Sequence, residues 1–160
     1  MRELKDKIAV VTGAASGIGQ ATAVEFAAKG ADVVVSDVNE AGLAETVSAI
    51  EAKGRRAVAL GVDVSKPEQV EGMINGAIDT FGRIDILMNN AGVGLSGEMR
   101  HLSLQDWEWI MGINLWGPIY GIHFALPHLV KQQSGHIVNV ASSAGLIARS
   151  CMSAYTTTKF

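Results

Sequence analysis

The sequence has very little cysteine. Cys151 is the single cysteine among 160 residues, so no disulfide can form within the chain. This usage fits a reducing compartment, and we expect a cytoplasmic protein. Because Cys151 has no partner thiol for redox or metal chemistry, we interpret it as a free thiol in a loop and not as a reactive group.

Charge is also scarce. Charged residues make up 18% of the chain, and 13 Lys and Arg leave a formal net charge of −3. The basic residues are scattered, which argues against nucleic acid or an anionic membrane surface as a partner. The four histidines show no spacing that pairs them with acidic residues on one face, so we expect no metal site.

Uninterrupted apolar runs of membrane-spanning length are absent. The longest apolar stretch, residues 113–130, contains Asn114, Pro118 and Pro127 as well as two histidines, a load that a membrane span would not normally carry. The charged residues 1–7 lead directly into a strand-like run and do not resemble a secretory signal. We therefore expect a soluble domain with no membrane partner.

Short apolar runs rich in β-branched residues alternate with helical patterns. The pattern predicts helices at 17–29, 39–53, 66–81 and 103–132, and strands at 8–11, 32–35, 57–60, 84–88 and 136–140. Apolar strands joined by helices predict an α/β fold, a doubly wound, Rossmann-type parallel sheet with helices on both faces. That sheet usually has six strands. We therefore expect residues 1–160 to form one dinucleotide-binding domain without its last strand or strands, which would need roughly 30 more residues.

Glycine, proline and serine mark the ends of these elements. Ser65, followed by Pro67 and Glu68, predicts a capped helix start, and Ser103 begins a weaker version of the same pattern. Pro118 should kink or divide the last predicted helix. Three glycines each follow the last turn of a predicted helix, where a left-handed residue is needed: Gly30, Gly54 and Gly82.

A glycine-rich turn, TGAASGIG at residues 12–19, lies between the first strand and the first helix. Glycines let the backbone turn sharply and approach a pyrophosphate, which then lies at the helix N-terminus. Such a turn can also be purely structural, but its place at the start of an α/β pattern favours a dinucleotide. The residues expected to bind it here are Gly13, Ser16, Gly17, Ile18 and Gly19.

Acidic residues follow the second and third strands. Asp37 comes 18 residues after Gly19, where a carboxylate accepts from ribose hydroxyls and repels a 2′-phosphate. No Lys or Arg lies within 12–28 or directly after Asp37, so NAD is favoured over NADP; a merely solvated carboxylate is the alternative. Asp63 and Val64 lie at the height of an adenine edge, where the carboxylate can accept from the exocyclic amine.

Tyr155 and Lys159 are four residues apart and therefore lie one above the other on a helix. A free phenol ionises near pH 10, and a neighbouring cation favours its ionised form. The pair is therefore suited to proton transfer at neutral pH. The sequence stops one residue later, at Phe160.

Taken in order and at their spacing, these motifs resemble the short-chain dehydrogenase/reductase family, in its compact single-domain branch. The resemblance covers the whole chain, and its motifs are TGAASGIG at 12–19, Asp63-Val64, Asn89-Asn90-Ala91-Gly92, Asn114, Ser142, and Tyr155 with Lys159.

The resemblance implies roles for the second half of the chain. Tyr155 would be the general acid/base, Lys159 would also bind the nicotinamide ribose, and Ser142 would hydrogen-bond the substrate oxygen. Asn114 would steady the lysine through a water, although it could instead satisfy the kinked helix near Pro118. Three residues, Asn90, Ala91 and Gly92, would support the cofactor, with Thr12 as their partner.

The implied function is an NAD-dependent oxidoreductase that moves a hydride between nicotinamide and a secondary alcohol or ketone. The resemblance also implies a homo-oligomer, a dimer or tetramer, for the full-length protein. If the chain ends naturally at 160, a non-catalytic NAD-binding fragment is the alternative, because a short terminal helix frays. An extended-branch epimerase or dehydratase shares Tyr-x-x-x-Lys, but Ser16 stands where its middle glycine usually falls.

Overall fold

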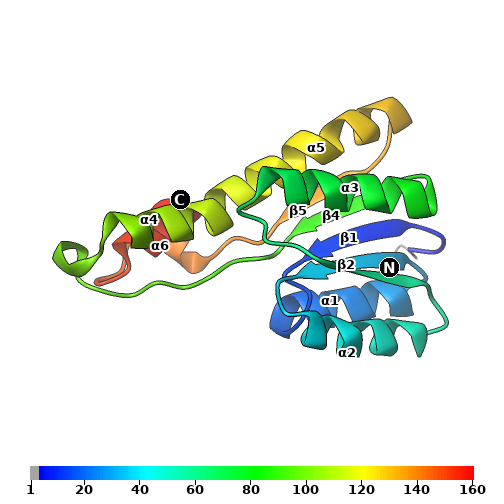
Figure 1. The fold of residues 1–160 in the computed structure, drawn as a ribbon, viewed down its shortest axis with the longest axis horizontal. Coiled ribbons are helices and arrows are strands. Elements are labelled where there is room, and N and C mark those ends of the chain that lie inside the picture. The colour runs from blue at the N-terminus through cyan, green and yellow to red at the C-terminus, as the bar shows by residue number, and fades with distance from the viewer. Residues whose placement is uncertain (1–3) are drawn as a thin grey trace.

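A five-stranded parallel sheet forms the centre of the computed structural model, which describes residues 4–160 (Figure 1). Residues 1–3, part of the charged N-terminal segment, lie outside the described residues. The strand order is β3-β2-β1-β4-β5, and every neighbouring pair is parallel. The strands are β1 (Ile8–Thr12), β2 (Asp32–Asp37), β3 (Ala57–Gly61), β4 (Ile86–Asn89) and β5 (His136–Asn139).

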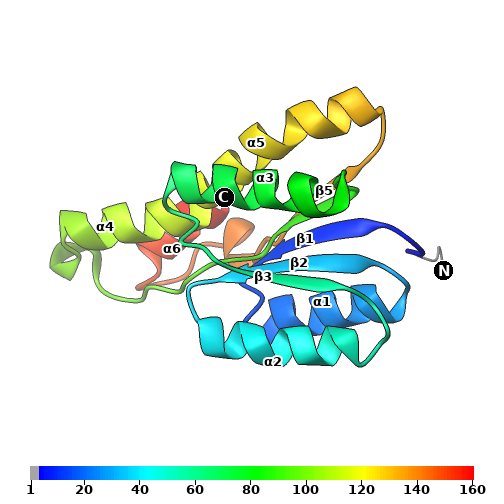
Figure 2. The ribbon, with the colours of Figure 1, turned by 45° about the vertical axis from the view of Figure 1, so that its right-hand side comes forward.

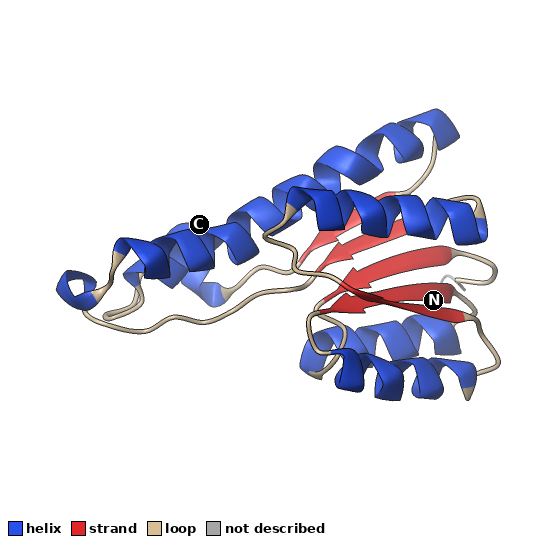
Figure 3. Cartoon of the chain, viewed as in Figure 1, coloured by secondary structure: helices blue, strands red, loops and turns tan. Residues whose placement is uncertain are grey.

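Helices cover both faces of the sheet, which confirms the doubly wound prediction (Figures 1 and 2). On one face lie α1 (Gly17–Ala28) and α2 (Glu40–Glu51), and on the other α3 (Pro67–Phe81) and α5 (Gly117–Gln132). Two further helices, α4 (Leu104–Met111) and α6 (Ser153–Lys159), pack against each other beyond the carboxyl ends of the strands (Figure 3). No helix within residues 4–160 is long and apolar enough to cross a membrane.

Alternation along the strands divides the core into two layers. In β1, Ala9 and Val11 belong to the apolar cluster beneath α1 and α2, whereas Val10 belongs to the cluster beneath α3 and α5. All three side chains are fully buried. A strand buried on both faces reads as an uninterrupted apolar run, because successive side chains point to opposite faces.

The fourth strand begins two residues later than the sequence predicts. Asp85 precedes β4, but its backbone N–H donates to the Ile8 carbonyl and its carboxylate accepts from the Ile8 N–H at 3.0 Å. Arg83 and Lys7 also donate to this carboxylate. Burial raises the pKa of Asp85, but these hydrogen bonds outweigh burial and hold that pKa below its usual value. Asp85 thus joins the starts of β1 and β4 through its side chain.

The expected helix at 103–132 is divided, as Pro118 predicts. A π-helical segment, Gly112–Trp116, separates α4 from α5, and Pro118 lies in the first turn of α5. Proline has no N–H, so the carbonyl of Asn114, four residues earlier, loses its α-helical donor. The wider π turn directly before the proline accommodates that loss.

Of the two serines predicted to cap helices, the one with the stronger sequence pattern does not cap its helix and the one with the weaker pattern does. Ser65 does not cap α3, whose N-cap residue is Lys66; the Ser65 hydroxyl donates instead to Asp63 Oδ1 at 2.7 Å. Ser103 forms a complete capping box with Asp106, each side chain bonding the other's backbone N–H. The three predicted left-handed glycines are confirmed, with positive φ at Gly30, Gly54 and Gly82.

Candidate active site

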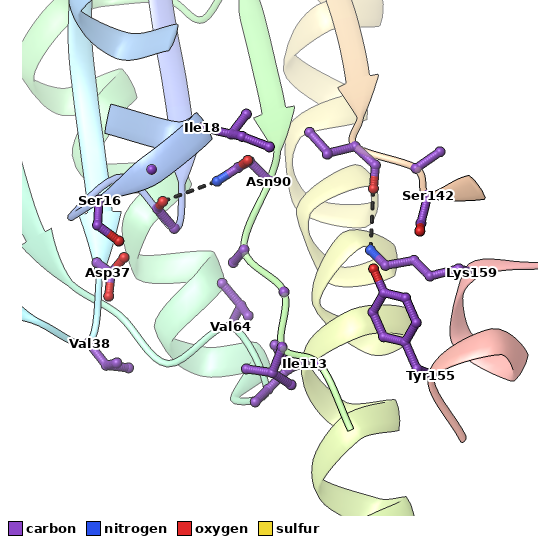
Figure 4. A pocket seen from close by; sticks show the side chains of 18 of the residues that line it. Ser16, Ile18, Asp37, Val38, Val64, Asn90, Ile113, Ser142, Tyr155 and Lys159 are labelled. Atoms are coloured by element: carbon purple, nitrogen blue, oxygen red, sulfur yellow. Dashed lines mark hydrogen bonds between the residues drawn. The ribbon is translucent and has the colours of Figure 1, made fainter. Parts of the chain in front are cut away.

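A cleft of about 830 Å³ opens at the carboxyl ends of the strands (Figure 4). Of the residues predicted for the site, every one lines this cleft except Gly19 and Asn114. The first half of the chain contributes the glycine turn and the ends of β2 and β3. Loops after β4 and β5, together with α6, contribute the remainder. Sequence reasoning missed several apolar lining residues: Val38, Val62, Ile113, Val140 and Met152.

The glycine turn leaves open space at the start of α1. Gly13 and Gly17 have positive φ values of 65° and 56°, and no atom of the described residues lies within 4 Å of a Cβ added at Gly17. Ser16, the N-cap residue, makes no side-chain bond to the helix N–H groups, so these donors face the cleft uncapped. A Cβ at Gly19 would collide with the Gly13 carbonyl. Gly19 therefore permits the tight turn without touching the cleft, and the turn fits a phosphate group.

Side-chain hydrogen bonds of Asn90 and Thr12 fix the glycine turn to the loop after β4. The Asn90 amide donates to the carbonyls of Thr12 at 2.9 Å and Gly13 at 3.0 Å. In return, the Thr12 hydroxyl accepts from the backbone N–H groups of Asn90 and Ala91, each at 3.0 Å. The loop after β4 is thereby bonded to the end of β1, and Ala91 and Gly92 form part of the cleft floor.

Asp37 is fixed in place by backbone N–H groups. Its Oδ2 accepts from Ala15 N at 3.1 Å and its Oδ1 accepts from Asn39 N at 3.0 Å. Each carboxylate oxygen can accept a further hydrogen bond. Asp37 is thus an ordered, charged wall of the cleft and not a freely solvated carboxylate, with the exposed Val38 beside it.

Asp63 and Val64 line the cleft after β3. Asp63 Oδ1 accepts from the N–H and the hydroxyl of Ser65, and the Asp63 N–H donates to the Gln69 side chain. This turn leaves Oδ2 of Asp63 without a hydrogen bond from the described residues. An acceptor of this kind is what an exocyclic amine requires.

Tyr155, Lys159 and Ser142 converge at the opposite end of the cleft (Figure 4). The phenol of Tyr155 points toward the amino group of Lys159, whose Nζ lies 6.0 Å from the centre of the ring. Lys159 Nζ also donates to the Val140 carbonyl at 3.3 Å. Ser142 Oγ accepts from Ala144 N at 3.2 Å, and its own proton has no acceptor among residues 4–160, so it can donate to a ligand. Ser143, its neighbour, does not line the cleft.

Asn114 is buried in the π-helical segment, with 4% of its surface exposed. Its Oδ1 accepts from Val93 N, and its Nδ2 donates to the Val93 carbonyl and to Thr158 Oγ1. Both amide protons are therefore used, and the side chain makes no hydrogen bond to Lys159 within residues 4–160. Asn114 Oδ1 and the Asn114 carbonyl can each still accept a hydrogen bond from a water that links to Lys159.

Cys151 is exposed and does not line the cleft. Its φ is +58°, and its carbonyl accepts from Gly97 N at 2.8 Å, which ties two loops together. No group of three or more metal-ligating side chains occurs in the part of the chain that the structure describes.

Comparison with known proteins gives consistent matches. A family model described as short chain dehydrogenase matches residues 7–160. A CLA biosynthesis dehydrogenase/reductase from Lactiplantibacillus plantarum is 39% identical over 100% of this chain and 56% of its own length. Meso-2,3-butanediol dehydrogenase from Serratia marcescens is 44% identical over 88% of this chain and 55% of its own length. The chain therefore spans little more than half of the curated relatives it matches.

Solved structures agree with this picture. A short chain dehydrogenase/reductase from Burkholderia phymatum in complex with NAD superposes with a TM-score of 0.96 at 39% identity, covering 99% of this chain and 57% of that chain. NAD+-bound xylitol dehydrogenase superposes with a TM-score of 0.94 at 32% identity, covering 99% of this chain and 61% of that chain.

Proposed function

Because this chain belongs to the short chain dehydrogenase family, we propose that it binds NAD and serves the reversible oxidation of a secondary alcohol to a ketone. One observation carries the proposal. Tyr155, Lys159 and Ser142 line the same cleft as the glycine turn and Asp37. A dinucleotide held by the turn therefore shares one continuous space with an acid/base group.

The residues of this chain fit a dinucleotide. Uncapped N–H groups at the start of α1 are suited to the pyrophosphate, and the open space at Gly17 admits it. Asp37 accepts from the ribose hydroxyls and disfavours a 2′-phosphate, which selects NAD. Asp63 and Val64 receive the adenine, and Ala91 and Gly92 lie beneath the cofactor. The NAD complexes of the superposable structures support this assignment.

The chemical step needs no protein nucleophile, because bound NAD supplies the hydride acceptor. Tyr155 takes the alcohol proton during oxidation and returns it during reduction. Lys159 lies beside the Tyr155 phenol and binds the nicotinamide ribose. Ser142, whose hydroxyl proton is free, donates to the substrate oxygen and orients it toward Tyr155. Asn114 supports Lys159 indirectly.

The proposed substrate is a small-molecule alcohol or ketone. The relative meso-2,3-butanediol dehydrogenase, 44% identical to this chain, is named for a secondary alcohol and so supports this substrate class. We further propose that residues 1–160 form a dinucleotide-binding domain, that the full-length protein is a cytoplasmic homo-oligomer, and that it has no nucleic acid or membrane partner.

A cofactor and alcohol screen tests the proposal. The purified full-length protein should form NADH, followed by its absorbance, from NAD with at least one secondary alcohol or vicinal diol. NAD titrated into the protein should bind more tightly than NADP. Tighter binding of NADP would overturn the cofactor assignment, and absence of NAD-dependent oxidation across the panel would overturn the reaction.

A further inference from the structure

Thr158 lies between the two catalytic candidates of α6, yet its side chain faces away from the cleft toward Asn114. We propose that Thr158 is a positioning residue, whose hydroxyl locks α6 to Asn114 and so fixes Tyr155 and Lys159 in the cleft. The inference rests on the proposed function, because it concerns how that acid/base pair is held.

The Thr158 hydroxyl is buried and makes two hydrogen bonds of opposite sense. Thr158 is 7% exposed. Its Oγ1 donates to the Tyr155 carbonyl at 2.8 Å and accepts from Asn114 Nδ2 at 3.1 Å. A hydroxyl has a single proton. Since that proton goes to Tyr155, the lone pairs are left for the Asn114 amide, and the direction of each bond is set.

The Asn114 amide extends this connection to the loop after β4. Its Oδ1 and Nδ2 bond the N–H and carbonyl of Val93, each at 2.8 Å. The hydrogen-bonded chain Val93–Asn114–Thr158–Tyr155 therefore joins three parts of the molecule. Gly92 lies next to both Asn114 and Lys159, since a Cβ added at Gly92 would be 3.4 Å from Asn114 Oδ1 and 3.6 Å from Lys159 Nζ.

α6 needs such an anchor. No side chain caps the N-terminus of α6. Tertiary contacts must therefore define the place of its first turn. Successive residues are about 100° apart around the axis. The Thr158 bond therefore fixes the rotation that points Tyr155 and Lys159 into the cleft.

Thr157 offers a matched control on the same helix. Its hydroxyl donates to the Ser153 carbonyl at 2.9 Å, and its side chain is exposed. The substitution Thr157→Val removes the same atom as Thr158→Val but breaks only a bond within α6. Thr158→Ser keeps the hydroxyl and removes the methyl group.

The first experiment compares these variants in the full-length protein. Thr158→Val should lower kcat about 10- to 100-fold, because small displacements of catalytic groups cost that much. The KM for the alcohol should change little, and NAD affinity should fall by less than kcat does, because the turn and Asp37 still hold the rest of the cofactor. Thr158→Ser and Thr157→Val should keep near-normal kcat. Near-normal kcat for Thr158→Val, or equal loss in Thr158→Ser, would overturn the proposal.

A double substitution tests the route through Asn114. If Thr158 acts by way of Asn114, adding Thr158→Val to Asn114→Ala should lower kcat no further. Multiplied losses would show that the two residues act independently and would contradict the proposal.

A second readout needs no turnover. In nuclear magnetic resonance spectra, the Asn114 side-chain amide protons should exchange with solvent about tenfold faster in Thr158→Val than in the wild type, with Thr158→Ser and Thr157→Val close to wild type. Backbone signals of Tyr155 and Lys159 should shift clearly more in Thr158→Val than in Thr158→Ser or Thr157→Val. Unchanged exchange and signals would overturn the positioning role. A wild type inactive toward every alcohol would instead overturn the proposed function, and this readout would still decide on Thr158.

Discussion

Asp37 holds a negative charge at one end of the cleft because two backbone N–H groups orient its carboxylate. Asp37→Asn removes the charge and keeps an acceptor oxygen. We expect the preference for NAD over NADP to fall at least about tenfold, since about 1.4 kcal/mol of relieved repulsion suffices for that. Titration of both cofactors measures the ratio. Asp79→Asn, the same change on the exposed side of α3, should leave it unaltered; an unaltered ratio in Asp37→Asn would contradict this role.

Asp85 stabilises the sheet in a pH-dependent way. Its native pKa lies below the usual value, so the unfolded chain binds more protons than the native state near and below pH 4. The stabilisation is complete above that range and is lost as pH falls through the native pKa. Asp85→Asn should lower the free energy of unfolding by about 2–3 kcal/mol at neutral pH, because it weakens hydrogen bonds to a charged group.

Urea denaturation of wild type and Asp85→Asn at neutral pH and near pH 3 checks this sign. The gap between the two proteins should narrow at the lower pH. A gap that is equal at both pH values would mean that the charge of Asp85 does not matter. Asp79→Asn again serves as the control for a surface carboxylate.

At the scale of elements, α5 lies so close to β4 that only glycine fits at position 121. A Cβ there would collide with Asn89 Oδ1 and reach Leu87 Cδ2 at 3.4 Å. Gly121→Ala should lower the free energy of unfolding by about 1–3 kcal/mol. Gly72→Ala, in α3 with nothing within 4 Å of the added Cβ, should raise it by about 0.5–1 kcal/mol. Thermal or urea unfolding measures both free energies. Equal effects of the two substitutions would contradict the close approach of α5 to β4.

All five strands could be predicted from the sequence. For β1, β2 and β4 the reason is that strands buried on both faces are continuous apolar runs. Their ends were harder to predict. Asp85 is joined to β1 through its side chain, and Ser65 bonds Asp63 instead of capping α3. The hydrogen-bond partners of Asp85 and Ser65 depend on which groups the folded chain brings near them, and the local sequence pattern does not contain that information.

In the cleft, too, some features could be predicted from the sequence and others could not. The predicted residues that line it stand in recognisable motifs. Thr158, in contrast, occupies an unspecified position of Tyr-x-x-x-Lys, and the Val140 carbonyl belongs to no motif. Thr158 meets Asn114 across 44 positions of sequence, and Val140 offers only a backbone oxygen to Lys159. Pro118 was the local signal near this contact, and the structure answers it with a π-helical segment that changes how Asn114 is presented.

At the scale of the whole molecule, the strand order explains why distant motifs share one cleft. In an open α/β sheet, ligands bind outside the carboxyl ends of the strands, where the order reverses direction. Here that reversal lies between β1 and β4, and the glycine turn and Asn90 stand on its two sides. α6 brings Tyr155 and Lys159 to the same edge (Figure 4).

The measurement that tests the account most directly is turnover by Tyr155→Phe in the full-length protein, beside Tyr120→Phe. Tyr120 is the other tyrosine, stacked on Trp116 and outside the cleft. We predict that Tyr155→Phe binds NAD nearly as the wild type does but loses at least about 10²-fold in kcat, while Tyr120→Phe keeps its activity. Near-normal turnover by Tyr155→Phe would contradict the central claim.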